Sequence, residues 1–166
     1  MTELKLYKGG REHIPVIQHI TREVWPQTYR PIISEAQIQY MMELMYSTKA
    51  LEQQLEDRHQ FLIAAFKNEP VGFASFAPSQ TEKEYQLQKL YVDPKYQKHG
   101  IGRALFQAIA DEVKQINGSH LILQVNRNNF NALAFYKRMG LVIEKEVNVS
   151  IGENFFMNDY IMGIFL

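Results

Sequence analysis

The stretch Leu90-Tyr-Val-Asp-Pro-Lys-Tyr-Gln-Lys-His-Gly-Ile-Gly-Arg-Ala-Leu105 connects a β-rich run to an amphipathic helix that opens with glycines. Gly100 and Gly102 have no Cβ, so their peptide groups can approach a bulky anion closely. The first turn of a helix also presents unpaired N–H groups and the positive end of the helix dipole. This stretch therefore predicts a loop that binds a phosphorylated ligand through its backbone.

The segment after these glycines has the pattern of a helix followed by a strand. The apolar side chains between Ile101 and Ile116 fall on one stripe, with polar side chains opposite. Asn117-Gly118 suits the left-handed turn that ends a helix, and residues 120–125 are rich in the branched side chains typical of a strand. The order predicts a strand, loop, helix and strand that form one βαβ-like unit.

Two common phosphate-binding loops do not fit this stretch. The chain has no Gly-x-x-x-x-Gly-Lys-Ser/Thr, and Leu105 stands where the dinucleotide fingerprint has its third glycine. The pattern that remains is Gln97-x-x-Gly100-x-Gly102 after the Leu-Tyr-Val run at residues 90–92. It resembles the signature Gln/Arg-x-x-Gly-x-Gly/Ala of the GCN5-related N-acetyltransferases (GNAT family). Two glycines that merely let a helix pack closely are the structural alternative.

A second motif lies near the end of the chain. The segment Asn129-Phe-Asn-Ala-Leu-Ala-Phe-Tyr136-Lys-Arg-Met-Gly140-Leu resembles the family's Asn-x-x-Ala-x-x-x-Tyr-x-x-x-Gly-Phe element, and the two motifs occur in the family's order. On a helix, Asn129 and Tyr136 lie on one face roughly 10 Å apart, and Ala132 between them leaves room for a slender ligand. An Asn-capped helix that ends at Gly140 is the structural alternative.

The composition excludes several classes of protein. Eighteen basic and eighteen acidic residues give a formal charge of zero, which argues against nucleic acid as a partner. The absence of cysteine excludes disulfides, thiolate metal sites and a cysteine acyl-enzyme, and the five histidines show no metal-ligand spacing, so no metal is expected. No signal segment or apolar run of about 20 residues is present, which predicts a soluble, cytoplasmic protein without membrane contact. The length of 166 residues predicts one domain over residues 1–166.

The patterns along the chain predict an α+β arrangement (α/β mixed) with a mixed central sheet of about seven strands. Pro26 and Pro31 predict an irregular bridge over residues 25–33. Helices are expected at about residues 11–24, 34–45, 48–56 and 101–116 and between Asn129 and Gly140, and strands at 4–8, 61–67, 71–76, 84–92, 120–125, 141–150 and 155–165. This order resembles the GNAT acyl-CoA N-acyltransferase fold over nearly the whole chain.

The resemblance implies acetyl-coenzyme A as the cofactor, in a cleft where the strand ending at Val92 and the strand beginning near His120 splay apart. It assigns the backbone of Leu90, Tyr91 and Val92 to the pantetheine arm and the acetyl group. It assigns Asn129 and Tyr136 to the pantetheine and the sulfur. The residues it assigns to the pyrophosphate are Gln97, Lys98, His99, Gly100, Ile101, Gly102 and Arg103.

The implied reaction transfers an acetyl group directly from acetyl-CoA to a primary amine. Tyr136 is at the family's position for the acid that protonates the leaving thiolate. Many relatives have a glutamate four residues before the position of Leu90, but this chain has Gln86 there. We expect Glu84, on the same strand face, to act as the catalytic base directly or through water, with His120 as a weaker candidate.

The acceptor is expected to contact the irregular bridge and the last hairpin, which line the cleft opposite the cofactor in this fold. We expect Trp25, Tyr29 and Gln86 to bind the acceptor. Further aromatic candidates are Tyr40, Phe155 and Phe156, and Glu23 or Glu153 could meet a cation.

Three functions remain open at this point. The first is an N-acetyltransferase for a small-molecule amine, which we prefer; the second is a protein or peptide N-acetyltransferase; the third is an acyl-CoA-binding module without turnover. A looser resemblance to spermidine/spermine-type acetyltransferases suggests a polyamine acceptor, which the uncharged Gln86 disfavours. The family and the apolar strand at residues 160–166 also suggest a homodimer.

Overall fold

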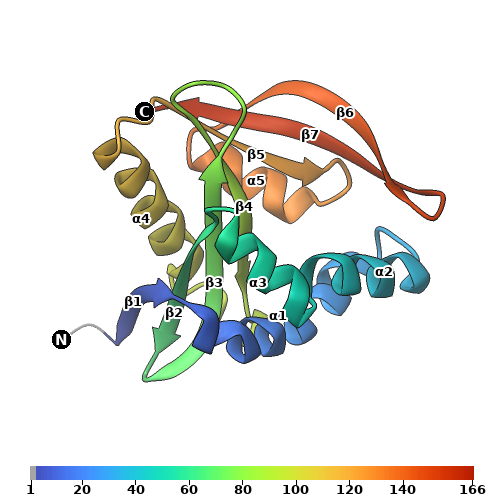
Figure 1. The fold of residues 1–166 in the computed structure, drawn as a ribbon, viewed down its shortest axis with the longest axis horizontal. Helices are drawn as coiled ribbons and strands as arrows, with labels where there is room; N and C mark the ends of the chain where they lie inside the picture. The colour runs from blue at the N-terminus through green and yellow to red at the C-terminus, as the bar shows by residue number, and fades with distance from the viewer. Residues whose placement is uncertain (1–2) are drawn as a thin grey trace.

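The computed structural model describes residues 3–166, which form a mixed sheet with helices on both faces (Figure 1). The seven strands have the order β1-β2-β3-β4-β5-β7-β6. Neighbouring strands are antiparallel except β4 and β5, which are parallel. The predicted α+β fold with a mixed sheet of about seven strands is confirmed.

The strands lie close to their predicted positions. The turns of two hairpins have positive φ at both central residues, Lys67 and Asn68 in one and Glu153 and Asn154 in the other, which is the geometry that tight hairpins favour. The strands are β1 (Leu4–Gly9), β2 (Gln60–Phe66), β3 (Glu69–Pro78), β4 (Glu84–Val92), β5 (His120–Asn126), β6 (Val142–Gly152) and β7 (Phe155–Phe165).

The helices begin where the sequence provides capping side chains. The Ser34 and Ser47 hydroxyls accept hydrogen bonds from the backbone amides of Gln37 and Ala50, at 3.1 Å each, and so cap the second and third helices. The helices are α1 (Ile14–Tyr29), α2 (Glu35–Tyr46), α3 (Thr48–Glu56), α4 (Ile101–Gln115) and α5 (Phe130–Arg138), with short 3-10 turns at Arg11–His13 and Pro94–Tyr96.

The expected irregular bridge at residues 25–33 is wrong in its first half. Helix α1 continues through Pro26 to Tyr29, and the Arg30 N–H donates to the Pro26 carbonyl at 3.1 Å. A proline inside a helix removes one donor and crowds the preceding turn. Trp25 and Tyr29 nevertheless pack into the core from this extra turn, and burial of large aromatic rings outweighs the local cost.

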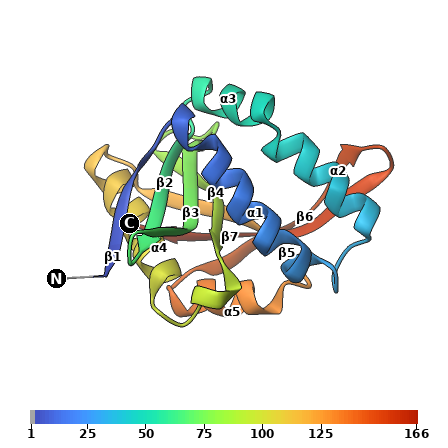
Figure 2. The ribbon, with the colours of Figure 1, turned by 90° about the horizontal axis from the view of Figure 1, so that it is seen from below.

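Two hydrophobic cores lie on opposite faces of the sheet. One core packs α4 and α5 against the sheet, and the other packs α1, α2 and α3 against the opposite face. Alternate residues of β2 enter different cores, since Leu62 belongs to the first and Ile63 to the second. Figure 2 shows α5 and the α1–α3 group on the two sides of the sheet.

Strands β4 and β5 separate after a short paired segment. Their parallel pairing extends from Glu84 with His120 to Leu87 with Leu123, and no further pair joins them in the described part of the chain. Next to this point β4 contains a β-bulge at Gln88, because Leu87 pairs with Phe76 and Lys89 with Ser75. The predicted splay in the centre of the sheet is therefore present.

None of the helices within residues 3–166 has both the length and the apolar character that crossing a bilayer requires.

Candidate functional site

The loop between β4 and α4 has a backbone shaped for a ligand. Lys98 and Gly100 have φ values of 71° and 74°, in the left-handed region that glycine adopts without cost. Gly100 is the residue that precedes the first turn of α4. Within residues 3–166, no carbonyl accepts a hydrogen bond from the backbone amides of residues 98–103. The loop and the start of α4 thus keep their donors available for an anion.

The side chains of this loop divide into two groups. Lys98, His99 and Arg103 are exposed, where their side chains can surround an anion. The Gln97 Nε2 instead donates to the carbonyl of Val92 at 3.4 Å. Gln97 therefore connects the loop to the end of β4.

Gly102 lies in the first turn of α4 and faces α5. A Cβ at this position would lie 3.5 Å from the Phe135 ring and 3.8 Å from the Leu90 side chain, which are ordinary contact distances. The protein itself has room for a small side chain at Gly102. A functional requirement for glycine here would come from a ligand that lies against the loop.

Beyond Leu87, where the pairing with β5 ends, the backbone of β4 on the side facing the gap has one partner in the described chain, the Gln97 amide at the Val92 carbonyl. The Asp93 N–H donates to the Val71 carbonyl at 2.7 Å, which fixes the alternation of the β3–β4 ladder. By this alternation the backbone groups of Tyr91 point to β3, whereas those of Leu90 and Val92 point into the gap. Of the three residues expected to bind the cofactor through their backbone, only Leu90 and Val92 are suitably oriented, and Tyr91 presents its side chain to the site instead.

Helix α5 places the second motif beside the gap. The Asn129 Oδ1 accepts the Ala132 N–H at 3.3 Å and caps the helix. The Tyr136 ring packs between Phe135 and Phe106, at centroid distances of 5.2 and 6.4 Å. Burial, with a contribution from Tyr29, raises the pKa of Tyr136, so its hydroxyl keeps its proton at neutral pH.

A cleft of about 200 Å³ lies on the α1–α2 side of the gap. Trp25, Tyr29 and Gln86, the three residues expected to contact an acceptor, all line it. The Trp25 ring packs on the Tyr29 ring at a centroid distance of 4.4 Å. The remaining walls come from α2, β4, β5 and β7. The structure therefore brings together the predicted acceptor residues.

Two charged residues of this cleft were not expected from the sequence. Asp159 is fully buried; the Gln124 Nε2 donates to its Oδ2 at 2.9 Å, while its Oδ1 has no partner within residues 3–166. Lys89 is only 7% exposed, and its Nζ lies 5.0 Å from the centroid of the Tyr46 ring. Burial raises the pKa of Asp159 and lowers that of Lys89 to about 8. The burial of Lys89 depends on the bulge at Gln88 and that of Asp159 on the pairing of β7 with β5, so no local sequence pattern indicated either residue.

Glu84, the expected base, does not line this cleft. It lies at the start of β4, where its carboxylate accepts from the Ser79 hydroxyl at 2.6 Å and contacts the His120 Nδ1 at 2.9 Å. The His120 Nε2 contacts Glu144 at 2.8 Å. Glu84 shares a strand face with Gln86, as expected, but lies at the paired end of β4, and its carboxylate is held by these neighbours.

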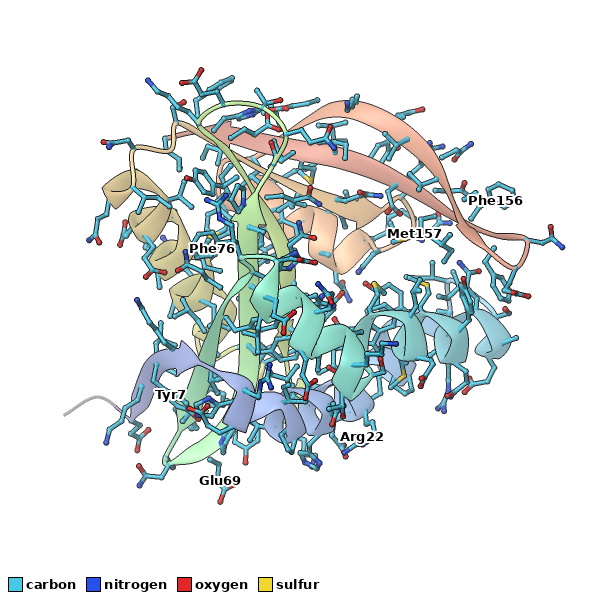
Figure 3. The ribbon with its side chains drawn as sticks, in the orientation of Figure 1. Tyr7, Arg22, Glu69, Phe76, Phe156 and Met157 are labelled. Atoms are coloured by element: carbon cyan, nitrogen blue, oxygen red, sulfur yellow. The ribbon has the colours of Figure 1, made fainter. Side chains whose placement is uncertain are left out.

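The tip of the β6–β7 hairpin is attached to α2 beside the cleft. The Tyr40 hydroxyl donates to the Ile151 carbonyl, and the Gln37 Nε2 donates to the Phe156 carbonyl at 2.9 Å. The Phe156 side chain is exposed, and Met157 lies on the opposite side of the strand and lines the cleft (Figure 3). Tyr40, Phe155, Phe156, Glu23 and Glu153 are not among the lining residues.

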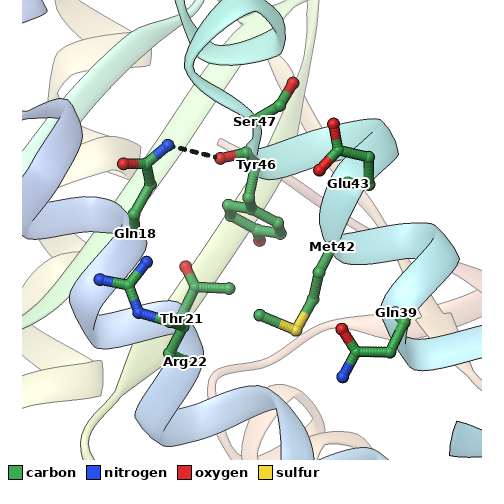
Figure 4. Close-up of a pocket in the computed structure, with 8 residues that line it drawn as sticks. All are labelled: Gln18, Thr21, Arg22, Gln39, Met42, Glu43, Tyr46 and Ser47. Carbon is green, nitrogen blue, oxygen red and sulfur yellow. Dashed lines mark hydrogen bonds between the residues drawn. The ribbon is translucent and has the colours of Figure 1, made fainter.

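A second hollow, of about 230 Å³, lies between α1 and α2 (Figure 4). The Gln18 Nε2 donates to the Tyr46 carbonyl at its edge, at 3.0 Å. Tyr46 lines both cavities. No residue of the loop before α4, of β4 or of α5 lines the second hollow, so it is separate from the site that the motifs define.

Solved structures with the same fold include acetyltransferases. The PaiA N-acetyltransferase of Thermoplasma acidophilum, in complex with coenzyme A, has a TM-score of 0.84 and 23% sequence identity, covering 98% of this chain and 99% of that one. The ribosomal-protein-S18-alanine N-acetyltransferase of Escherichia coli has a TM-score of 0.74 and 20% identity, covering 98% and 93%. These similarities establish the fold.

Curated relatives with different acceptors in their names match parts of the chain. The [ribosomal protein bS18]-alanine N-acetyltransferase of Escherichia coli (strain K12) is 38% identical over 68 residues, which are 40% of this chain and 46% of that protein. Streptothricin acetyltransferase of Streptomyces lavendulae is 30% identical over 84 residues, 51% of this chain and 44% of that protein. The chain thus spans less than half the length of these two relatives. Spermidine N(1)-acetyltransferase of Thermoplasma acidophilum is 25% identical over 146 residues, covering 85% and 89%.

The family profile described as "Acetyltransferase (GNAT) family" matches residues 17–141. This range is well over half of the 166 residues and contains the loop before α4, the separated strands and helix α5. The chain therefore belongs to the GNAT acetyltransferase family.

Proposed function

We propose that the protein transfers an acetyl group from acetyl-coenzyme A to the primary amine of a small molecule. The observation that carries this proposal is the gap between β4 and β5, which connects the free amides before α4 with the cleft lined by Trp25, Tyr29 and Gln86. The gap provides a path along which a long, thin cofactor can bring its reactive end to an acceptor.

The residues around the gap fit coenzyme A. The free amides of residues 98–103 suit its diphosphate, and the backbone of Leu90 and Val92 suits the amides of its pantetheine arm. We assign Asn129 and Tyr136 to the same arm and the sulfur, as the family resemblance implies. When bound, the cofactor supplies an acetyl thioester.

The reaction needs one group to take a proton and one to give a proton. An alkylamine with a pKa near 10 must lose a proton before attack, at a cost of roughly 4 kcal/mol at neutral pH. As the C–N bond forms and the C–S bond breaks, Tyr136 donates its proton to the leaving thiolate. Glu84 lies outside the cleft, so we assign Asp159 as the carboxylate that takes the proton of the amine.

The closure of the cleft favours a small acceptor over a folded protein. The bonds from Tyr40 to Ile151 and from Gln37 to Phe156 hold the hairpin tip on α2 beside the cleft. A cleft of about 200 Å³ is smaller than the 300–1,000 Å³ of typical drug-sized ligand sites. A protein or peptide N-terminus is the alternative, which the likeness to the bS18-alanine acetyltransferase supports.

Two further expectations remain proposals. The continuous seven-stranded sheet supports one domain over residues 1–166. The exposed apolar side chains of Val142, Ile143 and Val149 on the edge strand β6 support a homodimer.

A screen for release of free thiol tests the proposed function. The protein is incubated with acetyl-CoA and a panel of small amines and N-terminal peptides. We expect thiol release with small amines and acetylated amine in the mass spectrum. Release with peptides alone would favour the alternative, and tight binding of coenzyme A without release in any reaction would favour a binding module.

A further inference from the structure

The cleft contains one buried carboxylate and one buried ammonium group that do not pair with each other. We propose that the acceptor is a zwitterion of amino-acid size, whose ammonium group contacts Asp159 and whose carboxylate contacts Lys89. This inference rests on the proposed acetyl transfer and specifies its substrate class.

Asp159 is a buried carboxylate with one oxygen that lacks a hydrogen-bond partner in the described chain. It is 0% exposed, and its Oδ1 has no hydrogen-bond partner in the described chain. Arg127 donates to the Asp159 backbone carbonyl at 3.4 Å and forms its ion pair with Glu146. A buried carboxylate without a partner is costly, and Asp159 lines a cleft from which a cationic ligand could complete its contacts.

Lys89 is a buried ammonium group that likewise lacks an ion-pair partner in the described chain. It is 7% exposed, and its Nζ lies 5.0 Å from the centroid of the Tyr46 ring. None of the ion pairs within residues 3–166 includes Lys89 or Asp159. Lys89 also lines the cleft, so an anionic group of a ligand could reach it.

The two charges mark different ends of the cleft. Asp159 pairs with Asn126 at the end of β5, three residues before Asn129, the capping residue of α5, and this places it at the end of the cleft where β5 leads into α5. Lys89 lies on β4 against Tyr46, the last residue of α2. An acceptor that spans both charges would have its amine at the Asp159 end, where the thioester is expected.

Charge complementarity then selects among amines. Among the described residues that line the cleft, Asp159 and Lys89 are the only ionisable ones apart from the tyrosines. A diamine would place a second cation near the buried Lys89, and like charges at such a short distance disfavour binding. A simple alkylamine would leave Lys89 unpaired. An amino acid satisfies both groups, and the cleft volume of about 200 Å³ is enough for a molecule of that size.

Matched acceptors test the inference. Each pair contains an amino acid and the amine that its decarboxylation would give: phenylalanine and phenethylamine, lysine and cadaverine, 4-aminobutyrate and propylamine. We expect at least one amino acid to exceed its partner tenfold in kcat/KM, which is about 1.4 kcal/mol of discrimination. A uniform preference for the decarboxylated amines would overturn the inference.

Substitutions then identify the groups responsible. Lys89→Met keeps the aliphatic stem and removes the charge, and it should reduce the preference for the amino acid at least tenfold. The control is Lys49→Met, at an exposed position of α3, which should leave the preference intact. Asp159→Asn should raise KM for both members of each pair and, because it also removes the assigned base, lower kcat for both. Unchanged selectivity in Lys89→Met with its fold retained, judged by thermal unfolding and coenzyme A affinity, would contradict the assignment.

Calorimetry separates this inference from the proposed function. Amino acids and amines are titrated into the protein saturated with coenzyme A, so that turnover is not needed. Tighter binding of the amino acid without turnover would support the zwitterion site and contradict the transferase. Turnover restricted to polyamines or peptides would contradict the zwitterion site and leave acetyl transfer standing. Acetylation of Lys89 itself, located by peptide mass spectrometry, would do the same.

Discussion

The hydroxyl oxygens of Tyr29 and Tyr91 lie 3.1 Å apart and join helix α1 to strand β4 at the wall of the cleft. Burial raises the pKa of both side chains, and Tyr29 further raises that of Tyr91. Tyr46 and Tyr136 belong to the same group of interacting hydroxyls. Three of these tyrosines, Tyr29, Tyr46 and Tyr91, line the cleft. All four keep their protons at neutral pH, because a buried phenolate would destabilise the folded protein.

This group predicts a loss of stability at alkaline pH. A tyrosine whose pKa is raised by folding contributes stability that is present below its unfolded pKa of about 10 and is lost as the pH rises above that value. Each tyrosine with a strongly raised pKa should lower the free energy of unfolding by about 1 kcal/mol when the pH is one unit above 10. Urea unfolding from pH 8 to 11 measures this loss. Tyr46→Phe should reduce it, whereas Tyr7→Phe, at a partly exposed tyrosine on β1, should not.

Tyr136→Phe should lower kcat by at least tenfold, or about 1.4 kcal/mol, and change coenzyme A affinity less than twofold. Only the hydroxyl that donates to the leaving thiolate is removed, and the ring keeps its packing on Phe135 and Phe106. Steady-state kinetics and calorimetry measure the two effects, with Tyr7→Phe as control. An unchanged kcat would remove Tyr136 from the mechanism.

Asp159→Asn should stabilise the protein at neutral pH by about 1 kcal/mol while impairing acceptor use. Because burial raises the pKa of Asp159, its ionised carboxylate destabilises the folded protein at neutral pH. This cost, and with it the advantage of asparagine, should vanish as the pH falls towards 4. Asp111→Asn is a matched control, because Asp111 also accepts from a glutamine amide, that of Gln107, but is exposed. A neutral-pH stability of Asp159→Asn below that of the wild type would show that the protein stabilises the charged carboxylate beyond its hydrogen bond from Gln124.

His120 should make the far end of the sheet sensitive to pH. Burial opposes its charge, but hydrogen bonds with Glu144 and Glu84 outweigh this effect and raise its pKa. The stabilisation is therefore present below the unfolded pKa of about 6.5 and is lost as the pH rises through the folded value. His120→Gln should remove this part of the pH dependence, as measured by unfolding between pH 5 and 8. If the stability of the wild type and of the variant depended on pH in the same way, protonated His120 would not connect Glu84 and Glu144 as described.

The sequence patterns located nearly all of the sheet because alternation, turns and serine caps are local signals. The end of α1 was missed, since burial of Trp25 and Tyr29 overrides the local effect of Pro26. Lys89 was missed because the bulge at Gln88 shifts the alternation of β4 and moves Lys89 away from the face that carries Leu87. Such a shift depends on pairing with β3, which no local pattern reveals.

The sequence could predict which candidate residues lie together only where a motif or the expected cleft of the fold indicated them. Trp25, Tyr29 and Gln86 do line one cleft. Glu84 was selected by its strand face alone. It lies at the paired end of β4, and its bonds to Ser79 and His120 hold its carboxylate outside the cleft. Asp159 depends on the pairing of β7 with β5, a contact between segments about 30 residues apart.

The binding of coenzyme A to Gly102→Val tests the central claim most directly. A Cβ at this position makes only ordinary contacts, so once thermal unfolding has shown that Gly102→Val keeps its fold, a loss of affinity reports on a ligand against the free amides of residues 98–103. We predict that calorimetry gives at least a tenfold higher Kd for coenzyme A, about 1.4 kcal/mol, and an unchanged Kd for pantetheine, which lacks the diphosphate. The control Gln107→Val, at an exposed position of α4, should change neither. An unchanged Kd for coenzyme A in a folded Gly102→Val protein would contradict the account.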